Sequence, residues 1–190
     1  MSNSIMEIIL LRHGKPDFST AKRIAIRELP KMIATYNCAG VSQLPPASSV
    51  QMARACKHVV CSDLLRSVQS AKLLGVEQID LSEPLFREAD LPVTLWPSMK
   101  MSPYFWLVVF RILWFFGHSA DGESITQARL RAATAMQQLD TLAQTHGRVL
   151  FVGHGILNQF IAKELLSYGW QGPKRPARDH WGFSRYTLMK

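Results

Sequence analysis

The chain has 190 residues, of which 47% are hydrophobic and 19% are charged. These proportions are typical of globular proteins and exclude a disordered, collagen-like or coiled-coil chain. Lys and Arg outnumber Asp and Glu by 22 to 14, a net charge of +8, which favours an anionic partner. The N-terminus does not resemble a signal peptide and the three cysteines form no disulfide pattern, so we expect a cytoplasmic protein.

Short apolar runs alternate with helical patterns along the first half of the chain. Runs of four or five apolar residues are typical of strands buried on both faces, whereas Ser, Asp, Pro and Gly mark helix ends. In chain order, we expect a strand at 7–11, a helix beginning in 21–27 that Pro30 interrupts or restarts, a helix capped by Ser48 or Ser49, a strand at 58–61, and a helix from Ser62-Asp63 to Gly75.

The second half continues the alternation after an irregular, aromatic-rich section at 82–120. In chain order, we expect a strand at 78–81, the longest helix from 122–124 to Gly147, a strand at 148–153, a helix ending at Gly169 and an edge strand at 186–189. Strands that alternate with helices predict a single α/β domain over 1–190. We expect a three-layer α/β/α sandwich around a mostly parallel sheet.

Polar residues follow three of the predicted strands. Arg12 and His13 come after the first strand, Ser62 after the second and His154 after a later one. Because ligands of open α/β sheets bind beyond the carboxyl ends of strands, we expect these residues at one rim, together with Arg66. Each arginine can bind two phosphoryl oxygens at once, and a neutral imidazole can attack phosphorus. The rim therefore predicts a phosphate site with a histidine nucleophile.

Four ordered motifs resemble those of the histidine phosphatase superfamily, in its phosphoglycerate-mutase-like branch. They are Arg12-His13-Gly14, the segment from Ser62 through Arg66 to Ala71, Gly122-Glu123-Ser124, and His154-Gly155. The resemblance implies a phosphoglycerate mutase-like fold and a phosphohistidine on His13. It also implies phosphate binding by Arg12, Gly14, Arg66 and His154, with His154 among the catalytic residues, and neither a metal nor a cofactor. Ser62, Glu123 and Gly155 are secondary candidates at the site.

The resemblance points to Glu88 as the catalytic acid that protonates the leaving oxygen. Glu88 follows the segment Pro84-Leu85-Phe86-Arg87, after which the family acid usually sits. The chain then continues as Ala89-Asp90-Leu91-Pro92, where the family often has a glycine-rich stretch. Asp90 and Glu123 therefore stay as alternatives for the acid.

These features predict a phosphatase that hydrolyses phosphomonoesters through a phosphohistidine intermediate. Its substrate would be a phosphorylated small molecule or a phosphoprotein, and we expect no binding of nucleic acid. Two alternatives stay open. One is a phosphomutase of the same family, and the other is a non-catalytic module that binds a phospholigand or associates with a membrane.

The segment 104–116 is apolar or aromatic at every position except Arg111. It is too short to span a bilayer, which takes about 20 residues. It falls within a variable, aromatic-rich cap insert at about 90–120. Three uses stay open for it: a lid and apolar wall over the active site, a homodimer interface, or a weak contact with a membrane surface.

Overall fold

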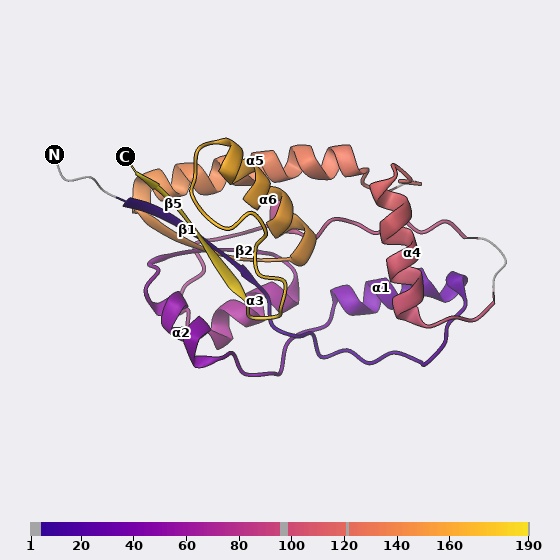
Figure 1. The fold of residues 1–190 in the computed structure, drawn as a ribbon. Helices are drawn as coiled ribbons and strands as arrows, with labels where there is room; N and C mark the ends of the chain where they lie inside the picture. Colours follow the sequence, from indigo (N-terminus) through magenta and orange to yellow (C-terminus); the bar gives the residue numbers. More distant parts are fainter. Residues whose placement is uncertain (1–4, 96–98, 121, 190) are drawn as a thin grey trace.

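The computed structural model describes residues 5–95, 99–120 and 122–189 (Figure 1). Strands in these ranges form one sheet in the order β3-β2-β4-β1-β5. β5 pairs antiparallel with β1 at one edge, and the other neighbours are parallel. The strands are β1 (Ile5–Arg12), β2 (His58–Ser62), β3 (Leu81–Glu83), β4 (Arg148–Gly153) and β5 (Phe183–Met189).

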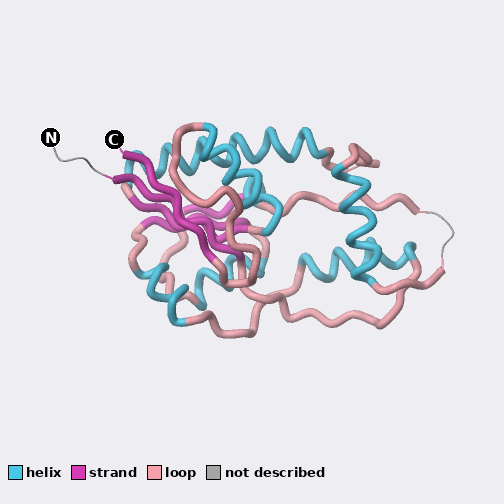
Figure 2. Tube along the Cα trace, in the orientation of Figure 1, coloured by secondary structure: helices cyan, strands magenta, loops and turns pink. Residues whose placement is uncertain are grey.

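Helices cover both faces of this sheet, as Figures 1 and 2 show. α5 (Ile125–His146) and α6 (Gly155–Ser167) pack on one face, and α2 (Ala47–Arg54) and α3 (Leu65–Leu73) on the other. Alternate residues of β1 supply the two cores, since Ile8 packs toward α5 and α6 while Ile9 packs toward α2 and α3. The predicted three-layer α/β/α sandwich with a mostly parallel sheet is confirmed.

A separate apolar core lies at the end of the molecule away from the sheet (Figure 1). Here α1 (Leu29–Asn37) packs against α4 (Pro103–Phe115), with Leu29, Trp106 and Phe110 buried between them. We call residues 18–37 and 99–116 the cap. The sequence placed the second of these segments in an insert at about 90–120, of which 96–98 lie outside the described residues. It gave no sign that the first segment joins it.

Three predicted helix starts in the first half were wrong. α1 begins at Leu29 after a 3₁₀ turn at Ile26–Glu28, so Pro30 lies in the first turn, where its missing N–H costs nothing. α2 begins at Ala47 with Pro46 at the N-cap, and Ser49 instead donates to the carbonyl of Trp181 at 2.9 Å. α3 begins at Leu65 with Leu64 at its N-cap, because the hydroxyl of Ser62 is used elsewhere.

The second half follows the prediction more closely. β3 begins at Leu81, at the last residue of the predicted strand, and continues to Glu83. α5 has the expected N-cap at Ser124, whose hydroxyl accepts from Gln127 N at 3.2 Å. It ends at Gly147, whose φ of 77° is the left-handed conformation that glycine adopts without strain. None of the described helices is long and apolar enough to cross a bilayer.

Candidate active site

The parallel pairing of β1 with β4 brings two histidines together at the carboxyl edge of the sheet. Arg12 pairs in register with Gly153, so the residues that follow, His13 and His154, leave the sheet side by side. Their ring centroids lie 5.0 Å apart. The rim predicted from the strand ends is therefore present.

His13 is held as a neutral imidazole with one nitrogen free to react. Its side chain is 2% exposed, and Nδ1 lies 2.7 Å from the carbonyl oxygen of Gly14. An N–H at Nδ1 donates to that oxygen, which leaves a lone pair on Nε2. Burial lowers the pKa of His13 to about 3, assisted by the positive charges of Arg66 and Arg12. A neutral ring is the form that a nucleophile requires.

His154 is fully buried, and two serine hydroxyls fix its ring. Its Nε2 lies 2.7 Å from Oγ of Ser62 and 3.3 Å from Oγ of Ser67. Burial lowers the pKa of His154 well below the ordinary value, with further contributions from His13 and Arg66. Ser62, predicted as a helix cap and secondary site residue, therefore orients His154.

The two arginines present guanidinium groups that are only partly paired. Arg66 is 2% exposed, stacks at 4.8 Å over the ring of Tyr36, and donates through Nη1 to Asn37 Oδ1 at 3.3 Å. Arg12 donates through Nη1 to the carbonyl of Arg178. The ring of Tyr36 and the carbonyl of Arg178 thus help to place both guanidiniums.

Three polar atoms of this cluster stand out. Within the described residues, Arg12 Nε, Arg66 Nε and His154 Nδ1 are buried and have no hydrogen-bond partner. An unpaired buried polar atom costs about 1–3 kcal/mol, so native proteins rarely keep several together without a ligand that pairs them. These atoms belong to three of the residues expected to bind phosphate.

Glu88 lies next to this cluster, at the N-terminus of α6. Its carboxylate accepts from Ile156 N at 3.1 Å and from Leu157 N at 3.0 Å. A Cβ placed on Gly155 would lie 3.7 Å from both Arg12 Cζ and Glu88 Oε2. Gly155 therefore faces the site between the phosphate ligands and the predicted acid.

The two alternative acids are placed differently. The carboxylate of Glu123 forms a two-point ion pair with Arg131, at 2.6 and 2.8 Å. Arg131 also donates to the carbonyls of Leu85 and Arg87 at 2.8 Å, so this pair braces the loop that carries Glu88. Asp90 is exposed, in the wall of the cavity described below. Of these three carboxylates, Glu88 is the one that lies beside Gly155 together with Arg12, a residue expected to bind phosphate.

Sequence reasoning gave Gly14 a different role from the one that the contacts show. Its N–H donates to Ser70 Oγ at 2.8 Å and is therefore not directed at a phosphate. A Cβ at Gly14 would lie 2.2 Å from the ring of Trp181, so this position needs glycine for packing. The loop around Trp181 also carries His180, whose ring centroid is 5.6 Å from that of His13. No motif in the sequence marked His180 as a neighbour of His13.

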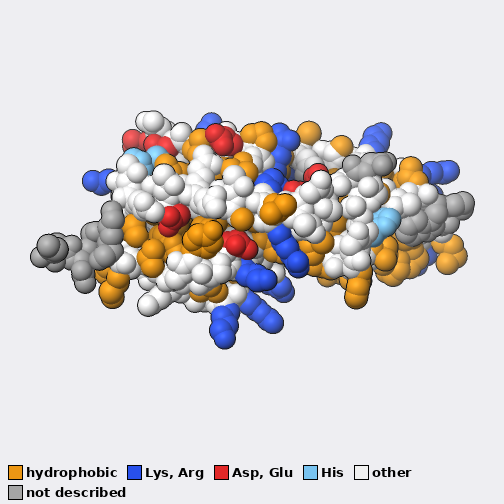
Figure 3. All heavy atoms as spheres, turned by 90° about the horizontal axis from the view of Figure 1, so that it is seen from above, with side chains coloured by type: hydrophobic (Ala, Val, Ile, Leu, Met, Phe, Trp, Pro, Cys, Tyr) orange, Lys and Arg blue, Asp and Glu red, His pale blue; other side chains and the backbone are white. Residues whose placement is uncertain are grey.

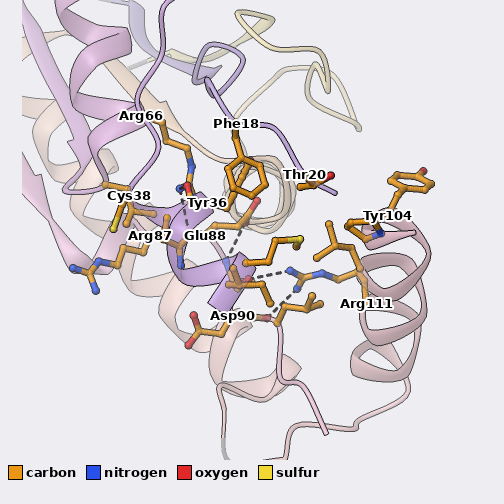
Figure 4. Close-up of a pocket in the computed structure, with 18 residues that line it drawn as sticks. Phe18, Thr20, Tyr36, Cys38, Arg66, Arg87, Glu88, Asp90, Tyr104 and Arg111 are labelled. Atoms are coloured by element: carbon orange, nitrogen blue, oxygen red, sulfur yellow. Dashed lines mark hydrogen bonds between the residues drawn. The ribbon is translucent and has the colours of Figure 1, made fainter. Parts of the chain in front are cut away.

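A cavity of about 620 Å³ opens beside the cluster, between α1 and α4 (Figure 4). Arg66 and Glu88 form part of its wall, whereas Tyr104 and Arg111 lie at the opposite side in Figure 4. Arg66, one of the residues expected to bind phosphate, therefore lies in the wall of a chamber large enough for a drug-sized molecule. Among the described residues, no group of three or more His, Cys, Asp or Glu side chains could hold a metal ion.

The depressed pKa of His13 predicts a loss of stability in acid. Between its ordinary pKa of 6.5 and the folded value of about 3, the unfolded chain holds a proton that the folded chain does not. Stability is therefore lost as the pH falls below about 6.5. We expect the thermal midpoint of the wild type to drop more between pH 7 and pH 4 than that of His13→Asn. Equal drops in the two proteins would contradict the burial of a neutral histidine.

Comparisons with known proteins agree with this geometry. The model of the histidine phosphatase superfamily (branch 1) matches residues 8–188. Mycobacterial glucosyl-3-phosphoglycerate phosphatase is 18% identical, with a TM-score of 0.61, over 96% of this chain and 90% of that one. A candidate α-ribazole-5′-phosphate phosphatase from Escherichia coli is 15% identical, with a TM-score of 0.59, over 97% and 95%. Phosphoglycerate mutase from Bacillus anthracis is 15% identical, with a TM-score of 0.58, over 98% and 89%.

No curated protein sequence matches the chain. At these identities the solved structures establish the fold alone, which is the expected phosphoglycerate mutase-like fold. The family match extends over almost the whole chain, including the motifs that carry His13, Arg66 and His154. The chain therefore belongs to the histidine phosphatase superfamily, branch 1.

Proposed function

We propose that the protein is a phosphatase that hydrolyses phosphomonoesters through a phosphohistidine on His13. The observation that carries the proposal is the set of unpaired buried atoms on Arg12, Arg66 and His154 around a neutral imidazole. Fixed N–H donors and positive charge stabilise a phosphoryl group as negative charge builds on its oxygens.

In the first step, the lone pair on Nε2 of His13 attacks phosphorus as the ester P–O bond breaks. The leaving oxygen takes a proton from the carboxylic acid of Glu88, which lies between the phosphate ligands and the cavity. The alcohol then departs through the cavity, and the phosphoryl group stays on Nε2.

In the second step, water attacks the phosphohistidine. The Glu88 carboxylate takes a proton from that water, and the P–N bond breaks with its electron pair returning to Nε2. The backbone N–H bonds from Ile156 and Leu157 hold the carboxylate in place for this role. Phosphate leaves, and the neutral imidazole is restored.

Release of inorganic phosphate from p-nitrophenyl phosphate and from a panel of phosphomonoesters tests the proposal. We expect one phosphate released for each alcohol formed, with water as the acceptor. Transfer of the phosphoryl group to a second hydroxyl of the substrate, without net release, would instead indicate a phosphomutase. Phosphate binding without turnover of any ester would indicate a non-catalytic module.

Removal of divalent metal should leave the rate unchanged. The proposed stabilisation of the phosphoryl oxygens comes from Arg12, Arg66 and His154, which are part of the chain. We expect the rate in EDTA to stay within about twofold of the untreated rate. A loss of activity that added Mg²⁺, Mn²⁺ or Zn²⁺ restores would contradict this assignment of the charge.

A further inference from the structure

Apolar and aromatic side chains supply half of the residues that line the cavity beside the expected phosphate ligands. Tyr36 of α1 and Leu107 of α4 both line it, and both side chains are partly buried. The apolar and aromatic residues of the wall are Phe18, Met32, Ile33, Tyr36, Leu64, Leu91, Pro103, Tyr104 and Leu107.

Two of the three basic side chains of this wall, Arg87 and Arg111, already have partners, whereas Arg66 keeps an unpaired Nε at the phosphate end. Arg111 donates to the carbonyls of Ala89 and Asp90 at 3.0 and 3.2 Å, and Arg87 pairs with Asp63 at 2.6 Å. Apart from these arginines, Thr20, Asn37 and Asp90 are the polar side chains of the wall outside the phosphate end, and a sugar or glycerate would bury its other hydroxyl groups against apolar side chains, which costs binding energy. An apolar body would instead gain from every methylene that leaves water.

We propose that the substrate is an amphiphilic phosphomonoester, with its phosphate at His13 and an apolar or aromatic body in the cavity. This inference rests on the proposed phosphatase function and specifies its substrate class. Arg66 and Glu88, which belong to the candidate site, also line the cavity (Figure 4), so a molecule in the cavity would have its phosphate end beside these two residues. The leaving oxygen would then lie at the junction, beside Glu88.

A series of n-alkyl phosphates from ethyl to octyl, used below the critical micelle concentration, tests the inference. We expect kcat/KM to rise with each added methylene, by roughly 10²-fold or more over the series. Leu107→Gln places a polar group in the wall, and Cys38→Trp fills space in it. Both should flatten the dependence on chain length, whereas Leu130→Gln, on the exposed face of α5, should not. Thermal unfolding confirms that each variant is folded.

The outcomes separate this inference from the proposed function. A wild type that hydrolyses glycerol phosphate or glucose phosphate with higher kcat/KM than octyl phosphate would overturn the substrate class and leave the phosphatase intact. A dependence on chain length that both wall variants retain would also overturn it. Absence of turnover and of phosphohistidine with every ester would overturn both.

A second observation concerns the outer face of α4. Phe116, at the end of α4, is 87% exposed, and helical spacing places other exposed apolar residues of α4 on the same arc. These are Phe105, Val108, Ile112 and Phe115. Figure 3 shows hydrophobic and basic side chains together at this end of the molecule.

The cap that carries this face is predominantly basic. The cap, residues 18–37 and 99–116, holds Lys22, Arg23, Arg27, Lys31, Lys100 and Arg111 but only one acid, Glu28. The carboxylate of Glu28 accepts from the backbone of Ala25 at 2.8 Å. A backbone bridge between Ile24 and Met101 brings Arg23 and Lys100 beside the start of α4. A second copy of this face would set these cations against one another, whereas an anionic bilayer would attract them.

We propose that the outer face of α4 binds the surface of an anionic phospholipid bilayer, with its aromatic side chains in the interface. The protein should co-sediment with phosphatidylglycerol vesicles, and a much smaller fraction of it should co-sediment with phosphatidylcholine vesicles. Phe105→Ser combined with Phe116→Ser should weaken binding at least tenfold. Leu44→Ser, which alters an apolar residue that is 75% exposed elsewhere, should bind like the wild type. No retention at low salt, or a dimer in solution that the double variant abolishes, would overturn this proposal.

Discussion

Replacing His13 by Asn should abolish turnover of every phosphomonoester. His13 is 2% exposed, and its Nδ1 is bonded to the carbonyl oxygen of Gly14, so Nε2 is the ring nitrogen left to react. An asparagine amide keeps the size and polarity of the side chain but offers no nucleophilic lone pair. We expect kcat to fall by roughly 10⁴-fold or more, the order of loss seen when an enzyme loses its nucleophile. Initial rates of phosphate release measure the effect.

His146→Asn provides the matched control for this experiment. His146 is exposed at the last residue of α5 and stacks on His58 at 4.0 Å, and the whole length of β4 separates it from His154. It should retain wild-type activity. Residual activity of His13→Asn above a few per cent of wild type would show that another group accepts the phosphoryl.

Replacing Glu88 by Gln should slow the hydrolysis of esters with poor leaving groups more than that of esters with good leaving groups. The amide oxygen can still accept from Ile156 and Leu157, so the side chain keeps its place while it loses the transferable proton. Alkyl phosphates need that proton and should slow by about 10²-fold or more. p-Nitrophenyl phosphate leaves as a stable phenolate, so its first step should slow far less.

The same contrast ranks the alternative acids. Glu123→Gln breaks the ion pair with Arg131, and Asp90→Asn alters an exposed wall residue. We expect both to affect alkyl and aryl esters alike, because neither supplies the proton. A selective loss with alkyl esters in Glu123→Gln, together with wild-type behaviour of Glu88→Gln, would assign the acid to Glu123.

The sheet and the residues at its rim could be predicted from the sequence because both depend on local patterns. Buried parallel strands require continuous apolar runs, and the runs that end at Arg12, Ser62 and Gly153 are the strands β1, β2 and β4. Parallel pairing then places the residues that follow, including His154, at one edge. This inference needs only the order of the strand ends and no detail of side-chain packing.

Other parts of the site depend on contacts between distant segments and left no local signal. Tyr36 stacks on Arg66 only because α1 folds back over the start of α3. His180 reaches His13 because its loop pairs with the end of β1, where Trp181 N donates to Arg12 O at 3.0 Å. The predicted cap role of Ser62 was wrong, since Leu64 is the N-cap of α3 and the hydroxyl of Ser62 bonds to His154.

The most direct test of the proposed chemistry is the covalent intermediate itself. Wild-type protein mixed with a ³²P-labelled ester and quenched within milliseconds should carry label that is stable in alkali and labile in acid, as expected of a phosphohistidine. Peptide mapping should place the label on His13, and His13→Asn should carry none. Label on another residue, or rapid turnover in which no quench time traps a labelled protein, would contradict transfer through His13.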